Sequence, residues 1–442
     1  MTTEINDHSP KCNRRSLLSG MAVAATGLGA AVAAAPMHAS QVSGLQEPTS
    51  MRIEGLERNS EHYWTAVREL FRLRPGLIAM NAANLCPSSA PVTQTLFDRT
   101  NDIDADPSHE NRAKYAERKE YTRQLLAEML GASSDEIAIT RNTSESNRAV
   151  IGGIDLKPGD EVLIWDQNHE SNNVAWEVWS QRLGFSLKRV STPDTPQSRE
   201  QLLKPFVDAM TPTTRIVSFS QVSNVSSVAL PAKQLCESIR ARGALSLCDG
   251  AQTFGLEVQN LQDLGCDFYT GSAHKWLCGP RETGVLYVRS EAQSGLWPPM
   301  VTHDWEKAST QGARKFDNLG QRDDGRLEAL GTAVQLYNFL GGDLIEARVR
   351  SHVAKLMAGL QSVSRKIHFL SPEATELRGG FVIFLYKGRN ARETLETLYN
   401  EYGISAAAAD LGDQTWVRLA PHIYNSGRDI DITIKAVKHL VS

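Results

Sequence analysis

A lysine, Lys275, stands between an apolar segment and a Gly-Pro turn in the stretch FYTGSAHKWLCGP, residues 268–280. Most lysines are exposed and serve only as solvated charges. A lysine at the end of a buried strand has another chemistry, because burial favours loss of its proton and leaves a nucleophilic amine. The position of Lys275 therefore makes it a candidate for Schiff-base formation with a carbonyl group.

Pyridoxal phosphate needs a lysine of this kind, together with an acid opposite its pyridine nitrogen and donors for its phosphate. Asp249 ends a second apolar segment, where a carboxylate would hold the pyridinium proton. Ser144 begins a predicted helix, so its hydroxyl and the first N–H groups of that helix would bind phosphate. Taken singly, Asp249 also fits a turn, Ser144 a helix cap and His169 an ordinary polar residue. Their joint occurrence at successive strand ends favours a cofactor site.

The elements that would position these residues alternate between short apolar strands and helical patterns. This alternation predicts an α/β fold with a mostly parallel sheet of the seven-stranded type. Five of the six candidate strands end in a polar cluster, and ligands of open α/β sheets bind outside the carboxyl ends of the strands. We therefore expect one shared site at that edge. The candidate strands span 136–140, 161–165, 215–220, 244–248, 266–270 and 284–288.

We predict four parts along the chain. The last part reads as helix, strand (381–386), helix, strand (415–420) and closing helix, with a break near its start at Gly341-Gly342. The extended stretch GLIAMNAANLCPSS, from Gly76, is expected to cross the entrance of the site. The four parts are a signal segment (1–39), an N-terminal segment (40–94), a large cofactor-binding domain (95–334) and a small C-terminal domain (335–442).

The composition suits a globular protein, since 41% of the 442 residues are hydrophobic and 22% are charged. The formal net charge is −4 and no basic tract resembles a nucleic-acid-binding arm, so nucleic acid is not an expected partner. Five cysteines follow the signal segment at irregular spacings, which favours buried reduced thiols over a disulfide framework. We assign no metal ligands.

The N-terminus carries a targeting pattern. Asn13-Arg14-Arg15-Ser16-Leu17-Leu18 precedes a weakly hydrophobic run, rich in alanine and glycine, that ends near Ala39. This order is typical of a twin-arginine signal peptide, which the Tat export machinery reads. An amphipathic or membrane-anchoring helix is the alternative. The signal predicts a periplasmic protein that acquires its cofactor before export.

Over residues 75–440 the chain resembles the fold-type I pyridoxal-phosphate enzymes of the class V aminotransferase group. This group contains cysteine desulfurases and isopenicillin N epimerase-like proteins. The resemblance implies a homodimer with shared active sites. The segments that carry it are RNTSESN, NHESNN, SNVSS, CDGAQTFG, GSAHKW and WVRLAPHIYNS.

The resemblance assigns a role to each candidate residue. Lys275 would carry the cofactor, Asp249 would pair with the pyridine nitrogen, and His169 would stack on the ring. Arg418 would clamp the substrate carboxylate, as suits a planar guanidinium, although an ordinary ion pair is the alternative. The other candidates are Thr143, Ser144, Ser272 and His274 at the phosphate, Glu145 at the cofactor, Gln252 at the ring oxygen, Asn224 near the ring oxygen or the substrate, Gln321 or Arg322 at the second chain's phosphate, and Asn81 for substrate.

The reaction is less determined than the cofactor, because one fold of this kind hosts many chemistries. A cysteine desulfurase needs a nucleophilic cysteine well after the lysine, but the last cysteine is Cys278, three residues beyond Lys275. The segment GQRDDGRLEALG resembles the epimerase branch instead. Loss of an α-proton to Lys275 leads either to epimerisation or to transamination. A lyase that eliminates a β-substituent without using a cysteine is a further alternative.

The export signal narrows the expected substrate, because tailoring of a secreted peptide needs no cytoplasmic partner. Exported relatives of this branch resemble enzymes that modify the glutamyl side chain of pyoverdine-type siderophores. We therefore expect an amino acid or a peptide-linked glutamyl group as substrate, changed by transamination-like chemistry. A protein that binds pyridoxal phosphate without turnover is the alternative from another class, although a pure binder has no need of both Lys275 and Asp249.

Overall fold

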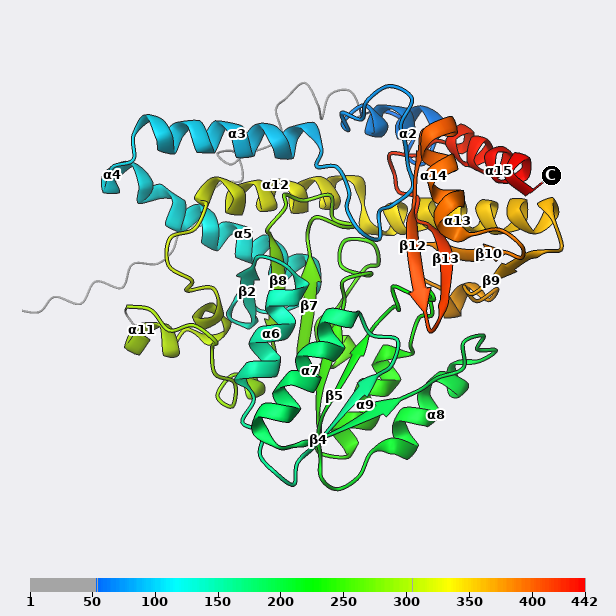
Figure 1. The fold of residues 1–442 in the computed structure, drawn as a ribbon. Helices are drawn as coiled ribbons and strands as arrows, with labels where there is room; N and C mark the ends of the chain where they lie inside the picture. Colours follow the sequence, from blue (N-terminus) through cyan, green and yellow to red (C-terminus); the bar gives the residue numbers. More distant parts are fainter. Residues whose placement is uncertain (1–52, 54, 304, 442) are drawn as a thin grey trace, which may run out of the picture. The chain divides into compact units, whose positions relative to one another are not determined.

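The computed structural model describes residue 53 and residues 55–303 and 305–441. Its largest sheet has the strand order β2-β8-β7-β6-β5-β3-β4 (Figure 1). Neighbouring strands are parallel except at β8, which runs antiparallel to β2 and β7. The predicted α/β fold with a mostly parallel sheet is confirmed. The strands are β2 (Ile137–Thr140), β3 (Glu161–Trp165), β4 (Ser186–Val190), β5 (Thr214–Ser220), β6 (Leu245–Asp249), β7 (Phe268–Ser272) and β8 (Gly284–Val288).

All six predicted strands of this sheet are present, with ends displaced by at most two residues. The seventh, β4, was not predicted. It lies at the edge of the sheet, and three of its five side chains, including Lys188 and Arg189, are exposed. An edge strand with charged side chains has no continuous apolar run, which is why the pattern of buried strands does not identify it.

Helices cover both faces of the sheet, which accounts for the nearly continuous apolar sequence of its inner strands. Val150, Ile151 and Trp176 belong to the core on one face, and Phe206 and Ile239 to the core on the other. Figure 1 shows α6 and α7 side by side on the first face. The helices are α6 (Thr143–Gly153) and α7 (Glu170–Leu183) on the first face, and α8 (Arg199–Ala209) and α9 (Ala232–Ala241) on the second.

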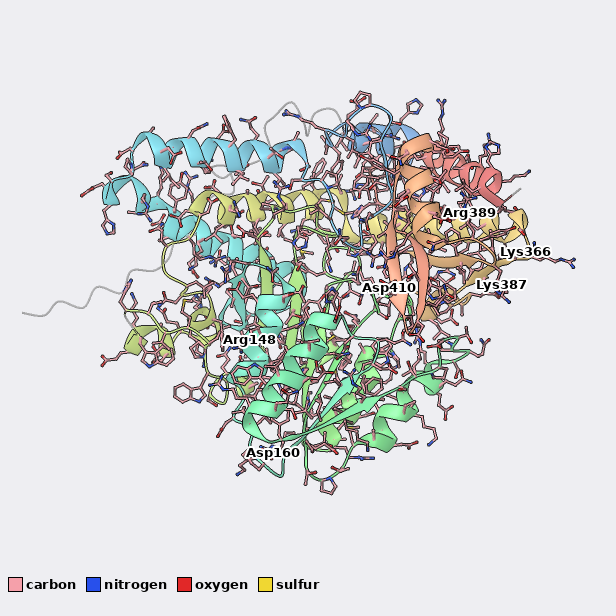
Figure 2. The ribbon with its side chains drawn as sticks, in the orientation of Figure 1. Arg148, Asp160, Lys366, Lys387, Arg389 and Asp410 are labelled. Carbon is pink, nitrogen blue, oxygen red and sulfur yellow. The ribbon has the colours of Figure 1, made fainter. Side chains whose placement is uncertain are left out.

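The C-terminal region forms a four-stranded antiparallel sheet in the order β12-β13-β10-β9. The predicted strands at 381–386 and 415–420 are β10 and β13, whereas the two outer strands were not predicted because one is short and the other is rich in alanine. Arg389, labelled in Figure 2, ties the end of β10 to the last helix by donating to the Leu440 carbonyl at 2.9 Å. The elements are α13 (Gly342–Val363), β9 (Ile367–Phe369), β10 (Val382–Tyr386), α14 (Ala391–Tyr402), β12 (Ala407–Leu411), β13 (Gln414–Leu419) and α15 (Gly427–Val441).

The predicted domain boundaries fall within helices. The position 334/335 lies inside α12 (Asp324–Leu340), and the position 94/95 lies inside α3 (Ala90–Ala105). The chain turns instead at Gly341, whose φ of +90° follows the end of α12. The predicted break at Gly341-Gly342 is therefore where one helix ends and the next begins.

The N-terminal segment joins the C-terminal region to the loop that carries Lys275. Residues Ile78 and Ala79 form β1, which pairs with β11 (Ile404–Ser405). The Ala82 amide then donates to the Ala420 carbonyl at 3.0 Å, and the Cys86 amide to the His274 carbonyl at 2.8 Å. The remaining elements are α2 (Glu61–Arg68), α4 (His109–Arg112), α5 (Lys114–Leu130), α10 (Leu261–Leu264), α11 (Trp305–Ser309), η1 (Ser134–Glu136), η2 (Ser290–Ala292), η3 (Gly312–Phe316) and η4 (Thr375–Leu377).

The predicted signal segment, 1–39, lies outside the described residues. Among the helices of the described ranges, none has the length and apolar character needed to span a bilayer. The five cysteines that follow the signal segment are free and buried, as expected.

A close backbone approach beside Lys275 requires glycine at position 255. Gly255 has a φ of +85°, and a Cβ there would lie 2.5 Å from the Leu277 amide nitrogen. We predict that Gly255→Ala lowers the free energy of unfolding by about 2–5 kcal/mol, because the left-handed conformation and the overlap with backbone both carry a cost. Urea denaturation measures this change.

Gly388→Ala is the matched control. Gly388 also has a positive φ, +95°, but a Cβ there would meet nothing within 4 Å. This variant should lose only about 1–2 kcal/mol. Equal losses in the two variants would contradict the claim that the packing against Leu277 excludes a side chain at position 255.

Candidate active site

The carboxyl ends of five strands bring the predicted site residues together. Because β2, β3, β5, β6 and β7 run in the same direction, the loops that follow them meet at one edge of the sheet. Contacts between these loops confirm the single shared edge. Asn147 reaches Asp249 at 2.8 Å, and Thr143 reaches Ser272 at 2.8 Å.

Lys275 lies at the centre of this edge. Its side chain is half-buried, and crowding by protein atoms lowers the pKa of its amine to about 8. The nearby Asp249 carboxylate opposes this shift, whereas the Arg418 guanidinium adds to it. A large fraction of the Lys275 amine is consequently neutral near pH 8, as a nucleophile or base requires.

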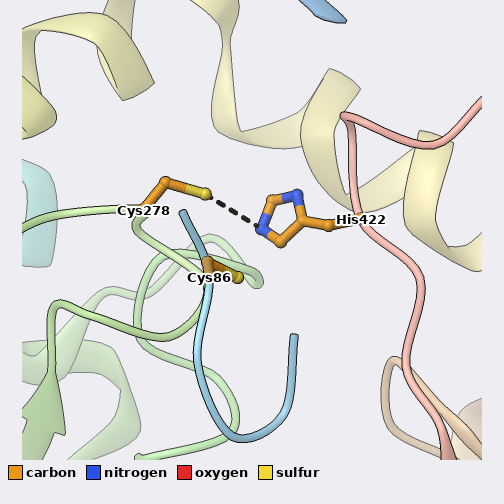
Figure 3. Close-up of side chains that lie close together, drawn as sticks. All are labelled: Cys86, Cys278 and His422. Atoms are coloured by element: carbon orange, nitrogen blue, oxygen red, sulfur yellow. Dashed lines mark hydrogen bonds between the residues drawn. The ribbon is translucent and has the colours of Figure 1, made fainter. Parts of the chain in front are cut away.

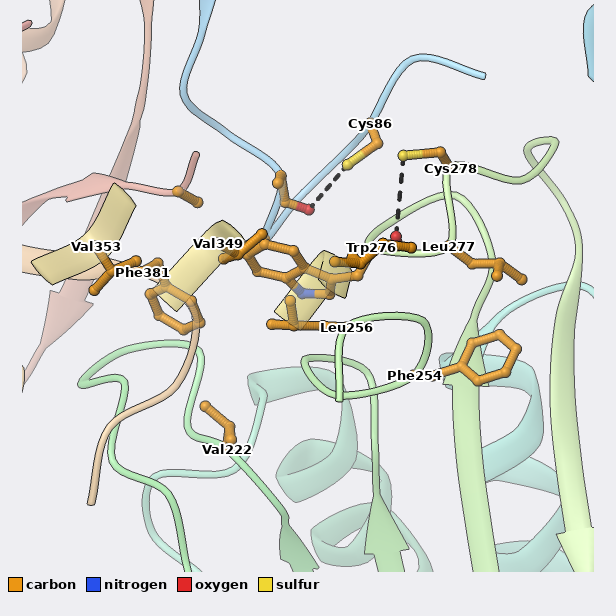
Figure 4. Close-up of a cluster of buried hydrophobic side chains, with 14 of the residues drawn as sticks. Cys86, Val222, Phe254, Leu256, Trp276, Leu277, Cys278, Val349, Val353 and Phe381 are labelled. Atoms are coloured by element: carbon orange, nitrogen blue, oxygen red, sulfur yellow. Dashed lines mark hydrogen bonds between the residues drawn. The ribbon is translucent and has the colours of Figure 1, made fainter. Parts of the chain in front are cut away.

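Trp276 fixes the backbone of the loop next to Lys275 (Figure 4). Its indole is 1% exposed, packs against Phe381 with ring centroids 6.3 Å apart, and donates to the Gln252 side-chain oxygen at 3.0 Å. The Gln252 amide nitrogen donates in turn to the Ala83 carbonyl at 2.9 Å. Gln252 therefore links three segments of the chain, and its predicted contact with the ring oxygen stays a prediction.

The Asp249 carboxylate is buried and held by two donors. The Asn147 side chain donates to one oxygen at 2.8 Å, and the Ala251 amide donates to the other at 3.0 Å. Thr270 orients Asn147 by donating to its side-chain oxygen at 2.8 Å. Asn147 was not predicted as a site residue, although it lies within the segment RNTSESN. The arrangement fixes an acid on the strand beside the one that carries Lys275.

The N-terminus of α6 supplies donors suited to phosphate. The Thr143 amide and hydroxyl both lie 2.8 Å from the Ser272 hydroxyl, and the Ser144 hydroxyl lies 3.4 Å from the Ser171 hydroxyl. The backbone dipoles of this helix place a positive end at the same turn, where the Thr143 amide donates to Ser272 and the Glu145 amide donates to Asn142. Burial, followed by the Lys275 charge, lowers the pKa of the nearby His274 to about 4, so its ring is neutral at pH 7.

Glu145, predicted to bind the cofactor, has structural contacts in this chain. Its carboxylate forms an ion pair with Arg141 at 2.8 Å, and its amide caps the helix by donating to Asn142 at 2.9 Å. A carboxylate engaged in this way offers no donor to a phosphate group. Among the described residues, no contact of Glu145 therefore supports its direct binding to the cofactor.

His169 begins α7 at the same edge of the sheet. Its Nδ1 accepts from the Ser171 amide at 3.2 Å, and the ring remains exposed. Crowding and the Lys275 charge lower the pKa of His169, although the Asp249 carboxylate opposes the shift. A neutral, exposed ring beside Lys275 fits the predicted stacking on a flat cofactor.

Arg418 is a buried cation whose charge has no carboxylate partner among the described residues. It donates to the Asn224 carbonyl at 3.0 Å and approaches the Asn81 side-chain oxygen at 3.5 Å. Burial lowers its pKa to about 10. Its Nε and the Asn224 side-chain oxygen are buried and find no hydrogen-bond partner in the described part of the chain. A substrate carboxylate and an amine would satisfy these two groups, so Arg418, Asn224 and Asn81 fit the substrate roles predicted for them.

Gln321 and Arg322 lie in a different place from the Lys275 site. Gln321 accepts from Arg112 at 3.1 Å, and Arg322 donates to the Ile139 carbonyl at 2.5 Å. Both line a cavity of about 550 Å³ that also contains Arg123. Their predicted contact with phosphate requires a second chain and stays a prediction.

Cys86, Cys278 and His422 form a compact buried group whose ligand atoms lie within 4.8 Å of one another (Figure 3). Both His422 nitrogens already have partners, since Nε2 lies 2.8 Å from the Trp276 carbonyl and Nδ1 accepts from the Ile423 amide at 2.7 Å. Burial raises the pKa of Cys278 well above its usual range. The group is therefore packing beneath the lysine loop, with an unreactive thiol.

The donor set fits pyridoxal phosphate. A half-buried amine, a fixed carboxylate on the neighbouring strand, a neutral ring and the N-terminus of α6 correspond to the four requirements of this cofactor.

Comparison with known proteins identifies the same group. The family model for aminotransferase class-V matches residues 88–432. Isopenicillin N epimerase from Streptomyces clavuligerus is 28% identical over 389 residues, which cover 83% of this chain and 96% of that protein. A probable cysteine desulfurase from Mycolicibacterium paratuberculosis is 29% identical over 75% of this chain and 50% of its own length.

Solved structures share the fold. A cysteine desulfurase from Thermococcus onnurineus NA1 superposes with a TM-score of 0.77 at 23% identity, covering 87% of this chain and 98% of its own. A mutant of C-DES with glycine covalently linked to its PLP cofactor gives a TM-score of 0.77 at 19% identity, over 84% of this chain and 98% of that one. The fold class expected from the sequence is thereby supported by both sheet topology and structural similarity.

The lowered pKa of Lys275 predicts an unusual pH dependence for its reactivity. In cofactor-free protein, reductive methylation of Lys275 should rise with a midpoint at about 8 and then level off, because the neutral amine is the reacting form. Exposed lysines in the same sample should continue to gain reactivity toward about pH 10. Mass spectrometry of the peptides follows each site separately.

Asp249→Asn provides the control for the electrostatic cause. Because the Asp249 carboxylate raises the pKa of Lys275, its removal should move the midpoint to lower pH. A Lys275 profile that matches the exposed lysines in both proteins would show that burial does not tune this amine.

Proposed function

The chain belongs to the class V aminotransferase family, and from that membership we propose a pyridoxal-phosphate enzyme that acts at the α-amino carbon of its substrate. The observation that carries the proposal is the presence, in one site, of the Lys275 amine, the held Asp249 carboxylate and the Arg418 guanidinium, which has no carboxylate partner among the described residues. The amine and the acid serve the cofactor, and the guanidinium serves a carboxylate of the substrate.

When bound, pyridoxal phosphate supplies an electron sink for negative charge at the α-carbon. Asp249 would pair with the pyridine nitrogen, and the first turn of α6, with Thr143, would hold the phosphate. Arg418 fixes the substrate carboxylate and so orients the α-carbon. The Lys275 amine, with its pKa of about 8, then takes the α-proton and returns it.

The place to which the proton returns decides the reaction. Return of the proton to the opposite face of the α-carbon gives epimerisation. Delivery of the proton to a different atom leads to transamination. The family relatives include both epimerases and cysteine desulfurases by name. We propose transamination-like tailoring as the leading reaction, with epimerisation or β-elimination as the alternatives and a binding protein without turnover as the alternative from another class.

A persulfide mechanism is disfavoured by the cysteines of the described residues. Cys278 follows Lys275 closely, is buried beneath the loop, and has a strongly raised pKa. A persulfide carrier requires a thiolate that reaches the substrate. No cysteine occurs after position 278 in the sequence.

The proposed location is the periplasm, and the proposed substrate is a peptide-linked glutamyl group of a secreted, pyoverdine-type siderophore. The twin-arginine pattern at Arg14-Arg15 and the resemblance to exported members of the epimerase-like branch support both. We also propose a homodimer, in which Gln321 or Arg322 of one chain reaches the other chain's phosphate site.

Loss of the Lys275 amine should block the proposed tailoring. We predict that a strain exporting Lys275→Ala secretes the siderophore with an unprocessed side chain, whereas a strain exporting Lys204→Ala, altered at an exposed lysine, secretes the wild-type product. Mass spectrometry of the culture supernatant compares the two. A Lys275→Ala strain that secretes the same siderophores as the wild type would refute the siderophore role. The leading hypotheses would then be an epimerase, whose product has an unchanged mass, or an enzyme that acts on a free amino acid.

Cys278→Ala tests the persulfide alternative. Because the thiol packs beneath the lysine loop and Ala keeps the same backbone strain at φ +53°, we expect kcat to stay within about threefold of wild type. Loss of about a thousandfold or more, in a variant that keeps its cofactor absorbance, would show that the thiol takes part in the reaction.

A further inference from the structure

A groove on the outer face of α6 and α7 begins beside the Lys275 site. Its volume is about 510 Å³. Arg148, labelled in Figure 2, rises from α6 on one side, and Arg182 rises from α7 on the other. The lining residues are Arg148, Ser171, Val174, Ala175, Val178, Trp179 and Arg182.

Two guanidinium groups enclose one indole in this groove. Arg148 lies 4.4 Å and Arg182 lies 4.3 Å from the centroid of the Trp179 ring. Among the described residues, neither guanidinium has a carboxylate or any other hydrogen-bond acceptor as a partner. Burial and the like charge of Arg182 lower the pKa of Arg148, as expected for two cations held together.

The arginines that surround the groove behave differently. Arg141, on the loop before α6, pairs with Glu145, and Arg189, after α7, pairs with Glu177. Among the described residues, the arginines of the groove therefore lack the carboxylate partners that neighbouring arginines on this face have. Two unpaired guanidinium groups on a rigid aromatic support form a binding place for carboxylate or another oxyanion.

Apolar side chains complete the groove. Val174 is 44% exposed and Val178 is 56% exposed, which is unusual for two valines on one helix face. These two valines form an exposed apolar strip along α7 within the groove. The groove thus offers charge at its walls and an apolar surface along its length, which suits an extended chain carrying an acidic group better than a free inorganic ion.

The groove is continuous with the cofactor end of the active site. The Ser171 hydroxyl, at the start of the groove, lies 2.9 Å from His169 Nδ1 and 3.4 Å from the Ser144 hydroxyl. Arg148 follows Ser144 by four residues, which places it about 6 Å further along the same face of α6. A substrate whose reacting end lies at Lys275 has this groove as a path for the rest of its length.

We propose that the groove is a subsite for the remote arm of a peptide-linked substrate, where Arg148 and Arg182 bind an acidic group of that arm. The inference rests on the proposed function, because it concerns the substrate of the same site. Binding of the remote arm would favour an extended acidic peptide over a free amino acid and would raise kcat/KM for the extended substrate.

The test uses the holoenzyme and two synthetic peptides labelled with fluorescein at the C-terminus. One peptide is Glu-Ser-Gly-Asp-Asp and the other is Glu-Ser-Gly-Asn-Asn, so that they differ only in the remote charges. We expect wild-type protein to bind the acidic peptide at least about tenfold more tightly by fluorescence anisotropy, with the preference weakened at about 0.3 M salt. Equal affinity for the two peptides would overturn the inference.

The variant Arg148→Gln/Arg182→Gln should bind both peptides equally. Its matched control is Arg189→Gln/Arg215→Gln, which removes the same charge from two arginines that have acidic partners, Glu177 and Asp160. The control should keep the wild-type preference. Loss of the preference in both double variants would show that net charge, and not the groove, attracts the acidic peptide.

A charge-reversal variant shows whether a lost preference for the acidic peptide reflects only poor folding. Arg148→Glu/Arg182→Glu should bind Glu-Ser-Gly-Lys-Lys more tightly than the acidic peptide, which a misfolded protein would not do. If the Gln variant keeps the peptide preference but changes its sedimentation coefficient, the groove belongs to an interface between chains and the inference fails.

The cofactor spectrum separates this inference from the proposed function. If glutamate and both peptides leave the cofactor absorbance unchanged, the proposed catalysis fails, while the anisotropy result still decides whether the groove binds acidic chains. If glutamate changes the spectrum and the peptides bind with equal affinity, the catalysis stands and the subsite is rejected.

Discussion

The position of Lys275 depends on the burial of its neighbour, Trp276. The indole lies in the core between the large sheet and the C-terminal sheet, where it packs on Phe381 and donates to Gln252. Its backbone carbonyl accepts from His422 at 2.8 Å. Three regions of the chain thus converge on the residue beside the reactive amine. A lysine on an otherwise mobile loop would lose the fixed geometry that its chemistry needs.

The same site holds charges that the protein leaves incompletely satisfied. Lys275 and Arg418 are two cations close together, and Asp249 is the anion whose field opposes the desolvation of the amine. Buried charges without partners cost stability, and proteins tolerate this cost mainly where a ligand supplies the missing partner. The unpaired Nε of Arg418 and the unpaired oxygen of Asn224 are therefore understandable as groups prepared for a substrate. Binding of cofactor and substrate should stabilise the folded chain.

The fold is shared with cysteine desulfurases and the sequence is similar to isopenicillin N epimerases and cysteine desulfurases, so neither fold nor family determines the reaction. Two features outside the candidate cofactor residues bear on the reaction and the substrate. Cys278 is packed beneath the lysine loop, and on the outer face of α6 and α7 the Arg148 and Arg182 guanidinium groups lie over the Trp179 ring. In the proposed subsite, this second feature would contact the part of the substrate that does not react and so favour one substrate over another.

The sequence by itself determined the fold class and predicted most residues of the candidate cofactor site. The inner strands of a parallel sheet are buried on both faces, so their apolar runs are visible locally, and the polar residues after each run mark the edge where ligands bind. For this reason Lys275, Asp249 and Ser144 were predicted as site residues before any contact was known. The outer strands β4, β9 and β12 lack such runs, because their side chains are partly exposed, whereas the outer strand β2 is fully buried and its apolar run is visible.

Only the tertiary structure decided how distant segments complete the site. Asn81, Asn224 and Arg418 come from three regions of the chain, and they meet because β10 and β13 pair in one register while the N-terminal segment bridges Asn81 to Ala420. The partners of Gln252 and Glu145 likewise depend on packing, which assigns them to Trp276 and Arg141. Sequence patterns report the burial of each residue, whereas the choice of partner among many compatible side chains is made by the assembled core.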